Sequence, residues 1–206
     1  MANNYAYLLD GKAYLNITNR CQNACSFCIR NTGDGVCGVP LWLDREPTVD
    51  EVLTAVKALN GEFSEVVYCG YGEPTENLTV LTSTARELKK LGYKLRLNTN
   101  GLGSAAAGRD ISAELRDFDV ISVSLNNHTA EKYLRITNSV FGPKAFDEVV
   151  AFALSCKRQG LNVVFTVVDV IGDSDVAECK ALCDKLGIPL RVRQYVADNY
   201  NNRKGV

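Results

Sequence analysis

Short apolar runs recur along this chain and alternate with longer stretches of helical periodicity. Residues 12–18 (KAYLNIT) alternate between apolar and polar side chains, whereas 65–69 (EVVYC) form a β-branched run that ends in glycines. Both patterns are typical of strands. Six strands are expected, at 12–18, 65–69, 94–99, 120–125, 162–168 and 189–195.

Helical stretches lie between these strands. Thr48 and Glu51 have the spacing of a capping box, which predicts that a helix begins there. Gly92 and Gly160 follow two further helical stretches, at a position where glycine commonly ends a helix. Helices are expected at 49–59, 78–91, 112–118, 144–159 and 173–186.

Strands that alternate with helices predict an α/β fold with a parallel sheet, built either as an open doubly wound sheet or as a barrel. A chain of 206 residues is long enough for one domain with its own core. We therefore expect a single domain over 1–206, with a frayed tail over about 198–206. In either architecture, ligands bind where the parallel strands end, so the loops after the strands should surround one site.

Composition narrows the classes of function. The formal net charge is −1, so there is no general basic field that would attract nucleic acid or an anionic membrane. No apolar run approaches the ~20 residues that cross a bilayer, and the N-terminus shows no signal peptide. We expect a cytoplasmic protein whose eight cysteines serve metal or redox chemistry rather than a disulfide framework.

Four of the eight cysteines lie within a single loop, 19–38, directly after the first predicted strand. Cys21, Cys25 and Cys28 have the spacing C-x3-C-x2-C. Three thiolates on one loop can ligate a metal centre but leave a four-coordinate site incomplete. The alternatives are three buried cysteines without a ligand, or a zinc site completed by Cys37 or His128.

Glycines mark two other loops. Gly70-Tyr-Gly-Glu-Pro74 follows the second predicted strand, where glycines let the backbone come close to a ligand, although a plain β-turn has the same composition. Gly33–Gly38 satisfies G-x-G-x-x-G but follows a cysteine loop rather than a strand, and Pro40 comes next. We interpret it as a flexible loop rather than a dinucleotide site.

The cysteine spacing, with the aromatic Phe27 before its last cysteine, resembles the cluster loop of radical S-adenosylmethionine (SAM) enzymes. The segment 70–74 resembles the family's Gly-Gly-Glu-Pro element, although Tyr71 stands where glycine is common. The resemblance implies a partial (β/α)6 barrel and a 4Fe–4S cluster on the three cysteines. It also implies SAM, bound to the open iron and cleaved to a 5′-deoxyadenosyl radical. The strings around both motifs look closest to the small radical SAM proteins associated with TatD-family hydrolases.

The same resemblance suggests residues that contact SAM. Glu73 would accept the methionyl ammonium, and Ser124 would meet the carboxylate or the ribose. By alternation, Ser122 and Ser124 share one face of their strand, which would be the barrel interior or, alternatively, a solvent-exposed face. The candidate cofactor residues are Phe27, Gly72, Glu73, Asn98, Asn100, Ser122, Ser124 and Arg135.

The reaction partners remain open at this stage. We expect a small-molecule substrate and an electron donor such as flavodoxin or ferredoxin, and an association with a TatD-family hydrolase is conceivable. The alternatives are a peptide- or protein-modifying enzyme, or a non-catalytic metal-binding or redox-sensing module. Arg191 and Arg193 share a strand face, as Arg96 does with Asn98. If these faces point into the barrel they favour an anionic substrate, and if they point outward they do not. Cys179 and Cys183 are expected to be buried rather than to hold a second metal.

Overall fold

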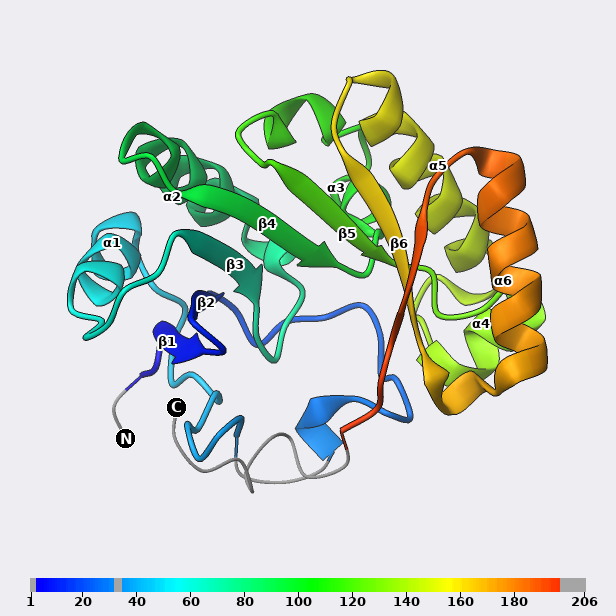
Figure 1. Ribbon diagram of the computed structural model, residues 1–206, viewed down its shortest axis with the longest axis horizontal. Coiled ribbons are helices and arrows are strands. Elements are labelled where there is room, and N and C mark those ends of the chain that lie inside the picture. Colours follow the sequence, from blue (N-terminus) through cyan, green and yellow to red (C-terminus); the bar gives the residue numbers. More distant parts are fainter. Residues whose placement is uncertain (1–2, 32–34, 197–206) are drawn as a thin grey trace.

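A computed structural model describes residues 3–31 and 35–196, and within these residues seven strands form one sheet in the order β1-β2-β3-β4-β5-β6-β7 (Figure 1). Strands β2 to β7 are parallel, and β1 is antiparallel to β2 at one edge. The strands are β1 (Ala6–Leu9), β2 (Lys12–Asn16), β3 (Glu65–Cys69), β4 (Lys94–Thr99), β5 (Val120–Ser124), β6 (Val163–Val168) and β7 (Leu190–Arg193). The six predicted parallel strands are confirmed.

The seventh strand, β1, was not predicted, because the first residues were judged only for a signal peptide. It forms a hairpin with β2 through Asp10 and Gly11, whose φ angles are 48° and 69°. Two central residues with positive φ match a type I′ turn, and Asp-Gly is a preferred pair for it. The dipeptide was therefore a usable signal for this strand. The structure also ends β2 at Asn16 and β7 at Arg193, two residues before the predicted ends.

The helices cover one face of the sheet, as Figure 1 shows for α1, α2, α5 and α6. The prediction missed α4, whose Thr129 side chain caps its first turn, and α3. The predicted helix at 112–118 is instead a 3₁₀ turn, Ser112–Leu115. The helices are α1 (Val49–Lys57), α2 (Leu78–Lys90), α3 (Gly103–Ala107), α4 (Ala130–Thr137), α5 (Ala145–Arg158) and α6 (Asp173–Leu186).

The main core lies between the sheet and these helices. Every second residue of the parallel strands belongs to it, such as Leu95 and Leu97 on β4 and Ile121 and Val123 on β5. The intervening residues, including Asn98 and Ser122, lie on the opposite, helix-free face. This one-sided covering is the arrangement of a partial barrel and matches the expected architecture. We call the helix-free side the inner face.

No helix in 3–31 or 35–196 is long and apolar enough to cross a membrane. The predicted frayed tail at 198–206 lies outside the described residues, as do residues 32–34 of the glycine-containing loop.

The capping box that opens α1 provides a test of local stability. The Thr48 side chain accepts a hydrogen bond from the Glu51 backbone, and the Glu51 side chain accepts one from the Thr48 backbone. Thr48→Ala should lower the free energy of unfolding by about 1 kcal/mol, because one backbone donor loses its partner. Urea denaturation measures this. The exposed Thr54→Ala in the same helix is the control, and equal losses in the two variants would contradict the capping role.

Candidate functional site

The cysteine loop follows β2 and passes the ends of the parallel strands (Figure 1). It is attached to the end of α4, because the backbone N–H groups of Ala24 and Ser26 donate to the carbonyls of Thr137 and Ile136 at 2.8 and 2.9 Å. Cys21, Cys25 and Cys28 are all partly exposed and free of disulfides. α4, which the sequence did not predict, thus supports the loop that the sequence singled out.

The three thiols lie close enough to influence one another. Burial, followed by the neighbouring Cys28 and Cys21, raises the pKa of Cys25 to about 12. Burial also raises the pKa of Cys21. A cationic centre would reverse these shifts, since it stabilises thiolates directly.

The donor set consists of three thiols, and thiolates are the usual ligands of iron–sulfur clusters. Within residues 3–31 and 35–196, no group of three or more His, Cys, Asp or Glu side chains is arranged to hold one metal ion. This arrangement gives no support to a zinc site completed by Cys37 or His128. A 4Fe–4S cluster spreads its thiolate ligands over separate iron atoms, and three thiols leave one iron without a protein ligand.

The segment 70–74 packs directly against the start of the cysteine loop. A Cβ on Gly72 would lie 2.3 Å from the Thr18 carbonyl oxygen and 2.7 Å from that of Arg20. A Cβ on Gly70, where φ is +103°, would lie 2.3 Å from the side-chain oxygen of Asn16. Both glycines are therefore required where segment 70–74 packs against the end of β2 and the start of the cysteine loop. The expected contact of this segment with a ligand stays a prediction.

Glu73 is 3% exposed and connects three segments. Its backbone N–H donates to the Arg20 carbonyl at 2.8 Å. Its Oε1 accepts from the Thr99 hydroxyl at 2.7 Å and from the hydroxyl and backbone N–H of Thr75, while Oε2 accepts from the Asn100 backbone at 2.6 Å. Burial raises the pKa of Glu73, and the four donors oppose that shift. The carboxylate thus fixes the loops after β3 and β4 to each other.

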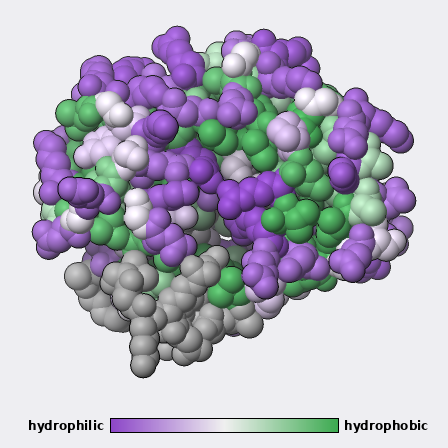
Figure 2. All heavy atoms as spheres, viewed as in Figure 1, coloured by the Kyte–Doolittle hydropathy of each residue, from purple (hydrophilic) through white to green (hydrophobic). Residues whose placement is uncertain are grey.

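The inner face of the sheet is polar near the strand ends. Asn98 pairs in register with Ser122, and Ser124 pairs with Thr166. Paired residues of parallel strands point to the same side of a sheet, so these side chains form neighbouring rows on the inner face. In the view of Figure 1, hydrophilic residues gather in the middle of the molecule beside a hollow (Figure 2). Of the two faces left open by the sequence, the structure has Ser122 and Ser124 on the inner face, together with Asn98.

Two other candidate residues meet at a cavity of about 350 Å³ beside the cysteine loop. Phe27 comes from the loop itself, and the exposed Arg135 comes from the last turn of α4. The cavity is also lined by Ser26, Asn127, Ile136, Val170, Ile171, Asp175 and Tyr195.

No motif in the sequence indicated that Asp175, on α6, would line a cavity. The Lys132 ammonium donates to it at 2.5 Å and the Asn127 amide at 3.1 Å, and these bonds lower the pKa of Asp175. The side chain of His128 is only 16% exposed, and its Nδ1 lies 3.9 Å from Asp175 Oδ1.

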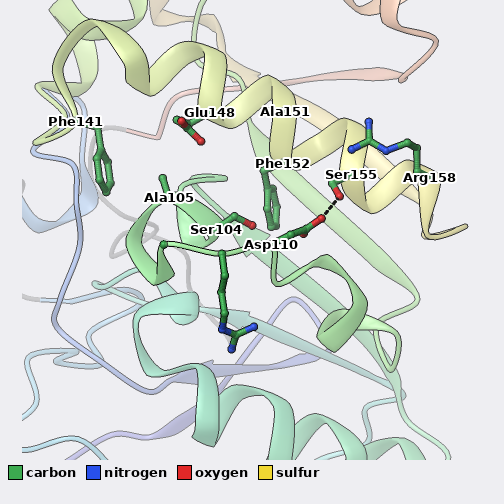
Figure 3. Close-up of a pocket in the computed structure, with 11 residues that line it drawn as sticks. Ser104, Ala105, Asp110, Phe141, Glu148, Ala151, Phe152, Ser155 and Arg158 are labelled. Atoms are coloured by element: carbon green, nitrogen blue, oxygen red, sulfur yellow. Dashed lines mark hydrogen bonds between the residues drawn. The ribbon is translucent and has the colours of Figure 1, made fainter.

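A larger cavity of about 490 Å³ lies elsewhere, between α3 and α5 (Figure 3). Phe152 and Ala105 are among its apolar lining, and the Ser155 hydroxyl donates to Asp110 at its edge. Its helices belong to the covered side of the sheet, so we do not assign it to the site at the strand ends.

The model of the radical SAM superfamily matches residues 15–186. The chain belongs to the radical SAM superfamily. The matched region begins within β2 and runs to the end of α6, so it contains the cysteine loop, segment 70–74 and the inner-face residues of β3 to β6, but not β7.

Individual relatives of this superfamily member are distant. It is 32% identical over 120 residues, 56% of its length, to the probable dual-specificity RNA methyltransferase RlmN of Nostoc sp. (strain PCC 7120 / SAG 25.82 / UTEX 2576). The structure of Streptococcus suis SuiB bound to S-adenosylmethionine superposes with a TM-score of 0.61 at 18% identity over 89% of this chain. A radical SAM methyltransferase from Sphaerobacter thermophilus gives 0.62 at 17% identity over 94% of this chain and 70% of its own. The structural likenesses show the shared fold.

This superfamily member spans only 31% of the RlmN chain and 38% of the SuiB chain. The sequence match and the structures therefore leave the substrate undefined. The resemblance to TatD-associated proteins stays a prediction.

The remaining cysteines of this superfamily member divide into two groups. Cys179 and Cys183 are buried in the main core, as predicted, and so is Cys156. Cys69, by contrast, is partly exposed and pairs with Asn16 on the inner face. The alternation of β3 explains the difference, because Val66 and Tyr68 take the core positions.

The role of Glu73 can be tested through stability. Glu73→Gln should lower the free energy of unfolding by about 1–3 kcal/mol, because an amide cannot accept from all four donors and leaves a buried polar group unpaired. Urea denaturation measures the loss. The exposed Glu62→Gln should stay within about 0.5 kcal/mol of the wild type. A Glu73→Gln variant as stable as its control would show that the carboxylate does not tie the loops together.

Proposed function

We propose that this chain is a radical SAM enzyme in which Cys21, Cys25 and Cys28 hold a 4Fe–4S cluster. One observation carries the proposal: three neighbouring thiols lie on one loop at the carboxyl ends of the parallel strands, beside a polar inner face. When bound and reduced, such a cluster supplies the electron that cleaves SAM to methionine and a 5′-deoxyadenosyl radical. The protein residues then bind, orient and shield the reacting groups from water.

We assign the SAM site to the inner face and the adjoining cavity. In this proposal the methionyl ammonium meets segment 70–74, where Gly72 and Glu73 are held against the cysteine loop. The serine and asparagine rows offer neutral donors and acceptors to the carboxylate and ribose. The residues we assign are Phe27, Gly72, Glu73, Asn98, Asn100, Ser122, Ser124 and Arg135.

The proposed substrate is a small anionic molecule. Arg191 pairs in register with Thr166 and Arg193 with Val168, so both arginines share the inner face with Ser124. Neither forms a salt bridge within the described part of the chain, whereas Arg96 is paired with Glu65. Both are exposed, so burial does not demand a counter-ion. Their common face supports the proposal, because a guanidinium group binds a carboxylate or phosphate through two parallel hydrogen bonds.

The proposal also covers the extent of the domain, the cellular compartment and the partner proteins. We propose one domain over 1–206, acting in the cytoplasm, because thiol ligands persist in a reducing compartment. The electron would come from a flavodoxin or ferredoxin. A functional association with a TatD-family hydrolase would follow from the sequence resemblance alone.

The cluster assignment predicts the iron content. Anaerobically reconstituted protein should bind about four irons per chain, and Cys21→Ala, Cys25→Ala and Cys28→Ala should each abolish the cluster. The double variant Cys179→Ala with Cys183→Ala is the control and should keep it. Iron analysis and the absorbance of the brown protein are the measurements. About eight irons per chain would contradict the single cluster, and a colourless zinc protein would favour the non-catalytic module.

The substrate assignment predicts that loss of an inner-face arginine impairs the reaction with substrate but not the cleavage of SAM alone. Arg193→Ala should reduce substrate-dependent formation of 5′-deoxyadenosine by roughly ten- to a hundredfold, the equivalent of one charge-assisted hydrogen bond. SAM cleavage without substrate should continue. The assay adds anion-exchange fractions of a metabolite extract to the reduced enzyme, with the exposed Arg158→Ala as control. Stimulation only by peptides, or equal rates in both variants, would contradict a small anionic substrate.

A further inference from the structure

Asn100 lies directly after β4 and points its side-chain amide at the cysteine loop. Its Nδ2 lies 3.7 Å from the sulfur of Cys21, within hydrogen-bonding reach of a sulfur acceptor, and 2.8 Å from Oε1 of Gln22. Cys21 also accepts from the backbone N–H of Asn23 at 3.5 Å. Cys21 therefore receives donors from two separate segments of the chain.

Hydrogen bonds on every side fix the orientation of the Asn100 amide. Its Oδ1 accepts from the Leu102 backbone at 2.9 Å, so the NH₂ group has to face Cys21 and Gln22. Gln22 is 5% exposed and donates its own amide to Glu76, which leaves its Oε1 as the acceptor for Asn100. The Asn100 backbone N–H is held in turn by Glu73.

The hydrogen bonds around Asn100 and Gln22 continue to the protein surface, where salt bridges of Arg20 with Glu76 and Glu46 hold them. The Arg20 guanidinium contacts the Glu76 carboxylate at 3.3 Å and donates to the Glu76 carbonyl at 2.7 Å. Arg20 also donates to both oxygens of Glu46, at 2.7 and 3.2 Å. A continuous chain of polar contacts thus runs from Glu46 through Arg20, Glu76 and Gln22. It ends at the Asn100 side-chain amide, which lies beside Cys21. A polar group held this rigidly at a ligand sulfur is typical of a residue that orients or tunes a metal ligand.

From this geometry we infer that Asn100 is a positioning residue that raises the reduction potential of the cluster by donating a hydrogen bond to the Cys21 thiolate, with Gln22 holding its amide in place. The inference rests on the proposed cluster and gives Asn100 a second role beside the SAM contact proposed above. A donor on a ligand sulfur withdraws negative charge. It therefore favours the reduced cluster, which carries one more electron.

The test is the midpoint potential of the reconstituted cluster in the absence of SAM, measured by reductive titration with EPR and absorbance. Asn100→Ala removes the donor and should shift the midpoint to a more negative value. Asn100→Asp keeps the acceptor for Leu102 and places a carboxylate near the thiolate, so its shift should be larger and in the same direction. The exposed Asn60→Ala should match the wild type. Gln22→Met, which frees the amide, should shift the midpoint less than Asn100→Ala.

The outcomes separate this inference from the proposed function. A wild-type protein that binds no iron would overturn the proposed function itself. A full complement of iron in both Asn100 variants, with midpoints equal to the wild type, would overturn only the inference. Loss of iron from both variants would also overturn it, since a donor that only tunes the cluster is not needed to assemble it. An unshifted midpoint with weakened SAM binding would overturn the inference and leave Asn100 only the proposed contact with SAM.

Discussion

The buried carboxylate of Glu73 is the contact on which the geometry of the site depends. It joins the loop after β3 to the loop after β4, and its own backbone holds the start of the cysteine loop. A carboxylate at 3% exposure is stable only because each neighbouring donor compensates for lost water. Gly72 completes the junction, since any side chain there would collide with the Thr18 carbonyl. Together with the backbone bonds from Ala24 and Ser26 to α4, this junction holds the cysteine loop against the ends of the strands.

The second constraint is that the helices cover only one face of the sheet. The core positions of each strand face those helices and are apolar. Because the alternate positions face away from this core, polar side chains can occupy them. In a complete barrel of eight strands, the inward side chains would fill the interior. Here the described residues form six parallel strands and a hairpin strand, and β1 and β7 are not paired with each other, so the sheet does not close into a complete barrel. The hydrophobic cluster of Tyr7, Leu9, Val36, Leu41 and Tyr71 fills only the end nearest β1.

Charge is distributed unevenly around this site. The thiols of Cys21 and Cys25 have raised pKa values, so binding a cationic centre would release protons as the thiolates form. Arg191 and Arg193 lie on the far edge of the same inner face, at β7. The guanidinium groups would favour ligands that carry carboxylate or phosphate, and the iron without a protein ligand in the proposed cluster would be open to a carboxylate. SAM has such a carboxylate, and the proposed substrate would have another anionic group.

The sequence by itself determined the parallel strands, the cysteine loop and the alternation of core and inner-face residues. These depend on spacing along one segment, such as C-x3-C-x2-C or the period of two that places Ser122 with Ser124. The Asp10-Gly11 dipeptide is a further local signal, because this pair is typical of the tight turn of a β-hairpin. Only the tertiary structure decided that Gly70 and Gly72 lie against Asn16 and the Thr18 carbonyl, that Cys69 lies on the inner face, and that Asn100 donates to both Cys21 and Gln22. Each of these depends on a partner distant along the chain, such as Asn100 and Cys21, which are 79 residues apart. The residue pattern of one segment does not predict the strand register or the loop contacts that bring such distant partners together.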